Sequence, residues 1–215
     1  MEESDCMDNG NILDYGKVSE DYAKYRDLYP DVFYQEIHKL GLCKKGKWVL
    51  DLGTGTGVLP RHLAKYGAKF IGVDISENQI SQARKLSEGM DIEYVVSSVE
   101  EMDFPHDTFD TVLACMCFSY FDQAVLLPRL AQILKSDGRL AILSLTWLSG
   151  ESIIAKGSEE MILKYNHSWS GTRCVRPSFD CNGIPTEYKI DTSLGFEFSG
   201  GRQKLDSGIS YERSL

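Results

Sequence analysis

Three glycines at every second position follow a short apolar run, and no other feature constrains the fold of this chain as strongly. The run Trp48–Leu52 is apolar apart from Asp51, and Gly53, Gly55 and Gly57 come directly after it. A short continuous apolar run is typical of a buried parallel strand. Glycines after such a strand permit a tight turn and let a ligand lie against the main chain. A helix just beyond would point its free N–H groups at that ligand, so the stretch predicts a nucleotide-type binding turn.

The spacing of the glycines separates two kinds of nucleotide site. The dinucleotide pattern G-x-G-x-x-G needs a third glycine where this chain has Val58. The pattern here is D-x-G-x-G-x-G, and a second acid, Asp74, closes the next apolar run, Phe70–Asp74. An acid at the tip of the second strand can accept hydrogen bonds from both hydroxyls of a ribose. We therefore expect a ribose-containing ligand, and the spacing disfavours a dinucleotide.

Strand and helix patterns alternate along the chain. The expected strands are Trp48–Leu52, Phe70–Asp74, Ile92–Val96, Phe109–Ala114 and Arg139–Thr146, with Gly138 closing the turn into the last of them. The expected helices are Asp31–Leu40, Leu59–Tyr66, one after Ser76 with Ile80, Ala83 and Leu86 buried, Asp122–Lys135 and Ser152–Tyr165. Pro128 implies that the fourth helix either kinks or becomes regular only near Leu127. Repeated strand–helix units predict an α/β fold with a doubly wound, mostly parallel sheet.

The segment Val49–Gly57, together with Val73–Ser76, resembles the class I, seven-stranded Rossmann-like methyltransferases that use S-adenosylmethionine, and in particular their small-molecule members. Further matching pieces follow in the family's order: Tyr22–Arg26 with Tyr29–Pro30, Phe104–Pro105 with Phe109–Asp110, and Leu134–Leu140. The resemblance implies an N-terminal helical lid, an insertion after strand five that forms a substrate cap, and a closing strand pair from Leu194–Phe198 and residues 209–215. On this basis the chain is one domain, residues 1–215, divided into a lid at 1–47, a cofactor-binding core at 48–147, a cap at 148–190 and C-terminal strands at 191–215.

The resemblance also implies a set of cofactor-binding residues. These are Tyr25, Arg26, Asp51, Gly53, Thr54, Gly55, Gly57, Asp74, Ile75, Ser98, Val99 and Cys115. Arg26 would pair with the methionine carboxylate, Asp51 would meet the amine, and Asp74 would hold the ribose hydroxyls. Ile75 would pack on the adenine, whose edge would meet Ser98 and Val99. Ser98 stands where the family usually has an acid, and Glu100 or Asp103 would substitute if that loop shifted.

Methyl transfer from a sulfonium requires little covalent chemistry from the protein, because holding the acceptor in line with the methyl group supplies much of the rate. The sequence accordingly shows no Ser/His/Asp arrangement. His167, beside Trp169 in the expected cap, is the histidine best suited to act as a base, and Tyr120 is expected near the substrate. His38 and His62 lie on expected helices and are interpreted as surface residues, and His106 as part of an exposed turn.

Composition and net charge disfavour several classes of partner and of cellular location. A net charge of −9 over 215 residues argues against a nucleic-acid partner. Residues 140–148 are too few to span a bilayer, and the acidic N-terminus does not resemble a signal peptide. The six cysteines have no zinc spacing and are expected to be reduced. We expect a cytoplasmic monomer or homodimer with a small-molecule substrate and no metal.

The leading hypothesis is a methyltransferase with S-adenosylmethionine as cofactor and an unidentified small-molecule acceptor. The alternatives are a non-catalytic sensor or partner subunit that binds the same cofactor, and an NAD-dependent oxidoreductase, which Val58 disfavours. A thiol-assisted arsenite methyltransferase would require cysteines to converge from positions 43, 115, 117, 174 and 181.

Overall fold

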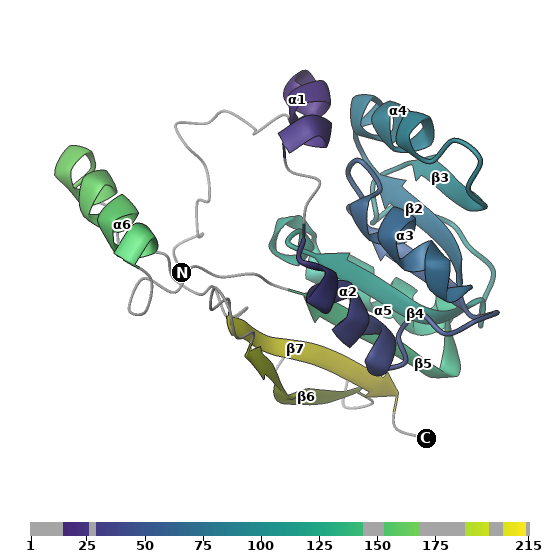
Figure 1. Cartoon of the computed structure of the whole chain (residues 1–215). Helices are drawn as coiled ribbons and strands as arrows, with labels where there is room; N and C mark the ends of the chain where they lie inside the picture. Colours follow the sequence, from purple (N-terminus) through teal and green to yellow (C-terminus); the bar gives the residue numbers. More distant parts are fainter. Residues whose placement is uncertain (1–14, 26–28, 144–152, 168–187, 198–203, 214–215) are drawn as a thin grey trace.

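A seven-stranded sheet forms the centre of the molecule (Figure 1). The computed structural model describes residues 15–25, 29–143, 153–167, 188–197 and 204–213. The strands are β1 (Trp48–Leu52), β2 (Lys69–Asp74), β3 (Ile92–Val96), β4 (Phe109–Cys115), β5 (Leu134–Leu143), β6 (Tyr188–Glu197) and β7 (Lys204–Arg213). Their spatial order is β3-β2-β1-β4-β5-β7-β6, in which β1 to β5 are parallel and β7 and β6 run antiparallel. The predicted α/β fold with a mostly parallel, doubly wound sheet is confirmed.

Helices precede or connect the strands. They are η1 (Tyr15–Val18), α1 (Ser19–Tyr25), α2 (Asp31–Lys39), α3 (Val58–Leu63), η2 (Ala64–Tyr66), α4 (Glu77–Leu86), η3 (Phe118–Tyr120), α5 (Gln123–Ile133) and α6 (Ile153–Tyr165). At the start of α4 the Ser76 hydroxyl accepts a hydrogen bond from the Gln79 N–H at 3.4 Å and so caps the helix. In the part of the chain that the structure describes, no helix is both long and apolar enough to cross a bilayer.

The central parallel strands β1 and β4 bury both of their faces, and successive residues of β1 show the division. Leu50 and Leu52 pack on one side with Leu126 and Leu130 of α5. Val49 packs on the other side, among the buried side chains of α2 and α3. Because side chains alternate along a strand, Asp51 points to the same side as Val49. The only acid of β1 is thereby placed on the α2 side of the sheet.

The transition from α5 to β5 differs from the prediction. Helix α5 runs without interruption from Gln123 through Pro128 to Ile133, so a start near Leu127 is wrong. The Asp122 carboxylate begins the helix by accepting hydrogen bonds from the N–H groups of the second and third residues after it, at 3.0 and 3.3 Å. Strand β5 then starts at Leu134, which pairs with Phe109, and the register shifts before the pairing resumes.

As a result, Gly138 lies within β5 and does not close a turn before it. A Cβ on Gly138 would lie 2.9 Å from the Lys135 carbonyl oxygen. The irregular backbone at the register shift therefore leaves room for glycine but not for a residue with a side chain. The expected end of this strand, at Thr146, lies outside the described residues. A further expectation is wrong for α4: Ile80 and Ala83 are buried, but Leu86 is 38% exposed because it is the last helical residue.

The C-terminal third contains a helix and a strand pair as predicted, but the strands begin earlier than predicted, at Tyr188 instead of Leu194 and at Lys204 instead of residue 209. Helix α6 is present and stands away from the sheet in Figure 1, and β6 and β7 pair antiparallel to each other. Several apolar side chains of α6 are exposed, including Ile153 at 90% and Ile154 at 80%. Most of the expected cap at 148–190, namely residues 148–152 and 168–187, lies outside the described residues. The cap therefore stays a prediction.

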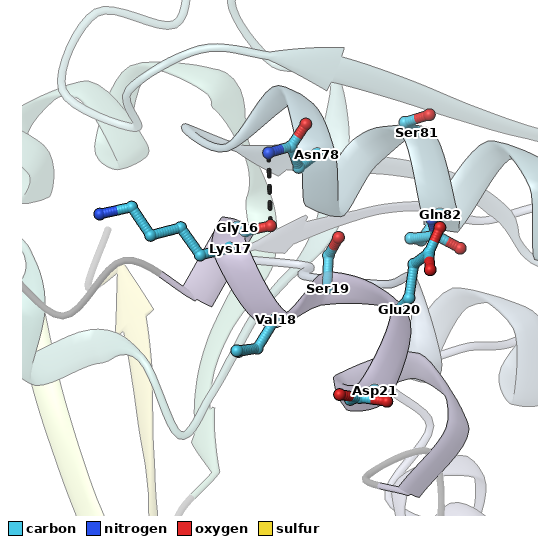
Figure 2. A pocket seen from close by; sticks show the side chains of 9 residues that line it. All are labelled: Gly16, Lys17, Val18, Ser19, Glu20, Asp21, Asn78, Ser81 and Gln82. Carbon is cyan, nitrogen blue, oxygen red and sulfur yellow. Dashed lines mark hydrogen bonds between the residues drawn. The ribbon is translucent and has the colours of Figure 1, made fainter.

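The N-terminal segment packs beside α4. The Asn78 side chain donates a hydrogen bond to the Gly16 carbonyl at 3.3 Å, and Ser19 is buried. Figure 2 shows the polar depression of about 350 Å³ that separates η1 and α1 from α4. Because α4 begins at Glu77, three residues after Asp74, this packing places the N-terminal segment close to the carboxyl end of β2.

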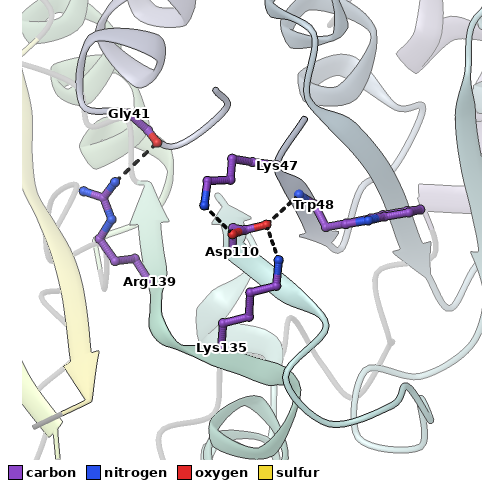
Figure 3. Close-up of polar contacts among 6 residues, drawn as sticks. All are labelled: Gly41, Lys47, Trp48, Asp110, Lys135 and Arg139. Atoms are coloured by element: carbon purple, nitrogen blue, oxygen red, sulfur yellow. Dashed lines mark hydrogen bonds and ion pairs between the residues drawn. The ribbon is translucent and has the colours of Figure 1, made fainter. Parts of the chain in front are cut away.

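Asp110 organises the opposite end of the sheet (Figure 3). This buried carboxylate accepts hydrogen bonds from Lys47 Nζ at 2.8 Å, Lys135 Nζ at 2.8 Å and the Trp48 N–H at 2.9 Å. Burial opposes its ionisation, but these three donors outweigh burial and lower the pKa of Asp110. Arg139 donates hydrogen bonds to the carbonyl oxygens of Leu40 and Gly41. Asp110 thereby ties together the amino ends of β1 and β4 with the start of β5.

Candidate functional site

All three glycines of the turn after β1 have left-handed backbones. The φ angles are +58° at Gly53, +55° at Gly55 and +75° at Gly57. L-residues with a side chain rarely adopt this conformation, because the Cβ crowds the following carbonyl oxygen. Gly57 is also the residue from which α3 begins. The alternating glycines are therefore required by the course of the backbone between β1 and α3.

The surroundings of the three glycines differ. A Cβ on Gly53 would lie 2.9 Å from the Cβ of Cys117, and one on Gly57 would lie 2.3 Å from the hydroxyl oxygen of Tyr94. At Gly55 the nearest atom would be Gln79 Oε1, at 3.9 Å. The protein thus packs tightly behind Gly53 and Gly57 and leaves space at Gly55. That space fits a ligand lying against the main chain, as the sequence predicts.

Asp74 is bound to the glycine turn. Its Oδ2 accepts a hydrogen bond from the Gly55 N–H at 2.9 Å, and its Oδ1 accepts one from the Ser76 N–H at 2.9 Å. Each carboxylate oxygen has a second lone pair. The two main-chain bonds therefore orient the carboxylate and leave it able to accept from the hydroxyls of a ligand.

Asp51 is a buried acid at the same end of the sheet. It is 2% exposed, and its Oδ2 accepts a hydrogen bond from the Thr54 hydroxyl at 2.6 Å. Burial raises the pKa of Asp51 to about 7; the Thr54 bond opposes the rise, and the charge of Asp74 adds to it. A buried carboxylate of this kind gains strongly from a cationic partner such as an ammonium group.

Tyr29 and two cysteines form the wall next to Asp51. Cys115 Sγ lies 3.7 Å from the Tyr29 hydroxyl, and Cys117 Sγ donates to the Leu52 carbonyl at 3.0 Å. Burial raises the pKa of Cys115 to about 12 and also raises the pKa values of Cys117 and Tyr29, with Asp51 adding to each. Both thiols stay protonated at neutral pH, so they are poor nucleophiles and line the site as small side chains.

The loop after β3 carries the remaining polar group of the site. The Ser98 hydroxyl donates to Glu100 Oε2, while Glu100 Oε1 accepts from the Asp122 N–H at 2.9 Å. Burial opposes ionisation of Glu100, but these hydrogen bonds lower its pKa below the ordinary value. The Val99 side chain is buried in the core. Ser98 therefore lies just beyond the end of β3, and its hydroxyl is hydrogen-bonded to the ionised carboxylate of Glu100.

The structure places the other predicted residues in different settings. Thr54 is buried against Asp51, whereas Ile75 is 75% exposed beside Asp74 and Tyr25 is 67% exposed at the end of α1. Arg26 lies outside the described residues, so its pairing with a carboxylate stays a prediction. Tyr120 is 60% exposed at the end of η3.

The structure corrects the expected setting of two of the histidines. His38 and His62 are half-buried, and their rings stack on Tyr66 at 4.0 Å and on Tyr34 at 4.5 Å between centroids. Their interpretation as surface residues is wrong because each ring covers an aromatic neighbour. His106 and His167 are exposed, the latter just beyond α6. In the described part of the chain, no group of three or more His, Cys, Asp or Glu side chains could hold a metal ion.

Three contributions to the site were not predicted from the sequence: the Tyr94 hydroxyl behind Gly57, the thiol of Cys117 behind Gly53, and Glu100 as a link to Asp122. The contacts of Tyr94 and Cys117 join segments far apart in the chain, so the local pattern carries no signal for them. For Glu100 a signal existed, because it follows the position where the family's acid is replaced by Ser98.

Comparison with known proteins agrees with this geometry. Residues 50–142 match the family described as "Methyltransferase domain". A protein of Dictyostelium discoideum named as a methyltransferase is 28% identical over 85% of this chain and 74% of its own length. The ubiquinone biosynthesis O-methyltransferase of Bradyrhizobium diazoefficiens is 32% identical over 79% of this chain and 66% of its own length. The chain spans from 51% to 74% of the length of such curated relatives.

A solved structure shows the same fold. The SAM-dependent methyltransferase from Aquifex aeolicus superposes with a TM-score of 0.61 at 18% identity, covering 93% of this chain and 98% of that one. The matched residues 50–142 contain the glycine turn, Asp74 and the Ser98 loop. With this fold, turn and strand-end acid, the chain belongs to the class I, Rossmann-like methyltransferases, whose cofactor is S-adenosylmethionine.

Proposed function

We propose that this protein transfers the methyl group of S-adenosylmethionine to a small-molecule acceptor. The observation that carries the proposal is the open space at Gly55, whose N–H is hydrogen-bonded to Asp74. The turn offers main-chain contact to a nucleoside, and the adjacent acid can accept from its ribose. When bound, the cofactor supplies an electrophilic methyl group on a positive sulfur.

The roles of the chain's own residues follow from their positions. Asp51 binds the methionine ammonium in the buried space beside Thr54, either directly or through a water. Asp74 orients the ribose, Ile75 offers an exposed apolar surface to the base, and Ser98 meets the edge of that base. Tyr29 and Cys115 close the methionine end against solvent. Positioning of the acceptor in line with the methyl group supplies the rate, so a nucleophile on the protein is not required.

For the acceptor, the first class to test is a hydroxyl on a small aromatic molecule. Relatives at about 30% identity are named ubiquinone biosynthesis O-methyltransferases. The net charge of −9 disfavours a nucleic-acid acceptor. The lid of residues 1–47, the cap of residues 148–190, the base His167, the placing of Tyr120 near the acceptor, the cytoplasmic location and a monomeric or homodimeric state remain parts of this proposal.

Binding calorimetry tests the cofactor assignment. We expect S-adenosylhomocysteine to bind with micromolar or tighter affinity and NADH not to bind. Binding of NADH alone would instead support the oxidoreductase hypothesis. Asp74→Ala provides the matched variant, because it should weaken S-adenosylhomocysteine binding by at least roughly a hundredfold.

Turnover tests the enzyme assignment separately. The protein is incubated with cofactor carrying an isotope-labelled methyl group and with a set of phenolic and other small hydroxylated compounds, and the products are separated by mass. A labelled product that is absent with the Asp74→Ala protein supports catalysis. Tight cofactor binding without a labelled product from these compounds or from a metabolite extract would favour the sensor or partner subunit.

A further inference from the structure

The Glu100 carboxylate fixes the orientation of the Ser98 hydroxyl, which lies just beyond the end of β3. The Ser98 hydroxyl donates its proton to Glu100 Oε2, and the Glu100 N–H donates back to Ser98 Oγ at 3.1 Å. A serine hydroxyl has one proton and two lone pairs. With the proton and one lone pair engaged, Ser98 retains a single lone pair for any further contact.

The position of Ser98 relative to the turn indicates which part of the cofactor it meets. Strand β2 lies between β1 and β3, and Asp74 pairs with Val96, two residues before Ser98. The Ser97 N–H donates to the Asp74 carbonyl at 3.0 Å, which holds the two strand ends together. A nucleoside whose ribose is held at Asp74 and whose other end lies at Gly55 therefore directs its base toward the end of β3. This step rests on the cofactor placement in the proposed function.

We propose that Glu100 determines base specificity by holding the Ser98 hydroxyl as a hydrogen-bond acceptor only. A purine with a 6-amino group donates a hydrogen bond and satisfies the remaining lone pair of Ser98. A purine with a 6-oxo group presents a lone pair to the same position and is repelled. Glu100 is in this scheme a positioning residue that acts through Ser98.

The second oxygen of Glu100 keeps the carboxylate in place. Oε1 accepts from the Asp122 N–H at 2.9 Å, and Asp122 caps α5. The Asp122 N–H requires an acceptor at the position of Glu100 Oε1. The amide of a Glu100→Gln variant must therefore turn its oxygen toward Asp122 and its NH₂ group toward Ser98. The NH₂ group then donates to Ser98 Oγ, and the hydroxyl proton turns outward toward the base.

The test compares S-adenosylhomocysteine with S-inosylhomocysteine, its 6-oxo analogue, in which N1 also carries a proton; the Ser98→Ala variant measures how much of the difference depends on Ser98. Dissociation constants are measured by calorimetry for the unaltered protein and for Glu100→Gln, Glu100→Ala, Ser98→Ala and the control Glu101→Gln, an exposed neighbour. Thermal unfolding of each variant checks that it is folded.

We expect the unaltered protein and Glu101→Gln to prefer the 6-amino compound by roughly tenfold to a hundredfold. Glu100→Gln should bring this ratio close to one or invert it, with tighter absolute binding of the 6-oxo compound. Glu100→Ala should also reduce the ratio, since the freed hydroxyl can rotate to donate, and Ser98→Ala should remove most of it.

Other outcomes would overturn the inference. If Glu100→Gln and Glu100→Ala weaken both ligands by the same factor, Glu100 only stabilises the loop. If the unaltered protein does not discriminate, or if Glu101→Gln changes the ratio as much as Glu100→Gln, Ser98 does not read the base through Glu100. A protein that binds S-adenosylhomocysteine while failing these tests leaves the proposed function standing, whereas a protein that binds neither ligand overturns both.

Discussion

The main-chain N–H of Gly55 donates a hydrogen bond to Oδ2 of Asp74, at 2.9 Å. This contact joins the turn after β1 to the acid at the end of β2, so two motifs separated in the sequence form one unit. In the proposed site Asp74 consequently has two roles: it offers its lone pairs to the ligand, and it orients the turn on which that ligand would lie. The first prediction separates these roles.

Replacement of Asp74 should affect cofactor binding in a graded way. Asp74→Ala removes the acceptor for both Gly55 and Ser76 and should weaken S-adenosylhomocysteine by at least roughly a hundredfold, since charge-assisted hydrogen bonds contribute about 1.5–3 kcal/mol each. Asp74→Asn retains one acceptor and should weaken it less. Calorimetry on both variants, with the exposed Asp91→Ala as control, measures the effect. Unchanged affinity in Asp74→Ala would disprove the site.

Gly55→Ala and Gly89→Ala form a matched pair. Both positions have a positive φ, +55° and +81°, and at neither would a Cβ meet an atom closer than 3.9 Å. Each substitution should therefore lower the free energy of unfolding by a similar amount, about 1–2 kcal/mol. Only Gly55→Ala should also abolish S-adenosylhomocysteine binding, because its methyl group enters the ligand space. Equal affinities in the two variants would show that the ligand does not lie on Gly55.

Asp51 should make stability and binding depend on pH. Its pKa in the folded protein is about 7, above the ordinary 3.8, so the folded chain retains a proton that the unfolded chain loses. Stability is therefore lost as the pH rises from about 4 to about 7, at up to about 1.4 kcal/mol per pH unit. Asp51→Asn does not lose stability in this way. The unfolding free energy of the variant minus that of the unaltered protein should therefore increase by a few kcal/mol between pH 5 and pH 8.

The same group should release a proton when the cofactor binds. An ammonium group favours the ionised carboxylate, so affinity for S-adenosylhomocysteine should rise between pH 5.5 and pH 8. Urea unfolding and calorimetry at three pH values check both effects, with Asp91→Asn as control. If affinity shows no rise in the unaltered protein beyond that seen in Asp51→Asn, Asp51 does not bind the ammonium.

Asp110 should contribute to stability without affecting the site. Asp110→Asn removes the charge that Lys47 and Lys135 face, which should lower the unfolding free energy by about 1–2 kcal/mol at pH 7, since both lysines are partly exposed and screened. The folded pKa of Asp110 lies below its ordinary value, so this contribution is present above about pH 4 and is lost as the pH falls through the folded pKa. S-adenosylhomocysteine should bind unchanged; the exposed Asp91→Asn serves as the control.

Local patterns predicted the parts of the fold that depend on neighbours in the chain. Strands β1 and β3 are found at Trp48–Leu52 and Ile92–Val96 as predicted, and β2 and β4 differ from the prediction by one residue each. A largely apolar run defines β1, β2 and β4, which are buried, whereas β3 is partly exposed. The glycine turn was predictable because its spacing reflects backbone conformation. The start of β5 was not, since Leu134 joins the sheet through pairing with Phe109, a contact that the sequence around Gly138 does not encode.

The same distinction applies to the site. Asp51, Gly55 and Asp74 lie at strand ends whose positions follow from the pattern, so they could be expected to come together. The contact of Tyr94 with Gly57 and that of Cys117 with Leu52 depend on the register of strands far apart in the chain. The surroundings of His62, stacked on Tyr34, likewise require the packing of α2 on α3.

The open space at Gly55 also limits how this protein can be redesigned. Where the binding surface consists of peptide groups and a missing side chain, no substitution is available that would adjust affinity there in small steps. Attempts to accept altered cofactors, or to exclude the natural one, should therefore begin at the loops after β3 and β4, where the proposed contacts come from side chains that can be exchanged individually.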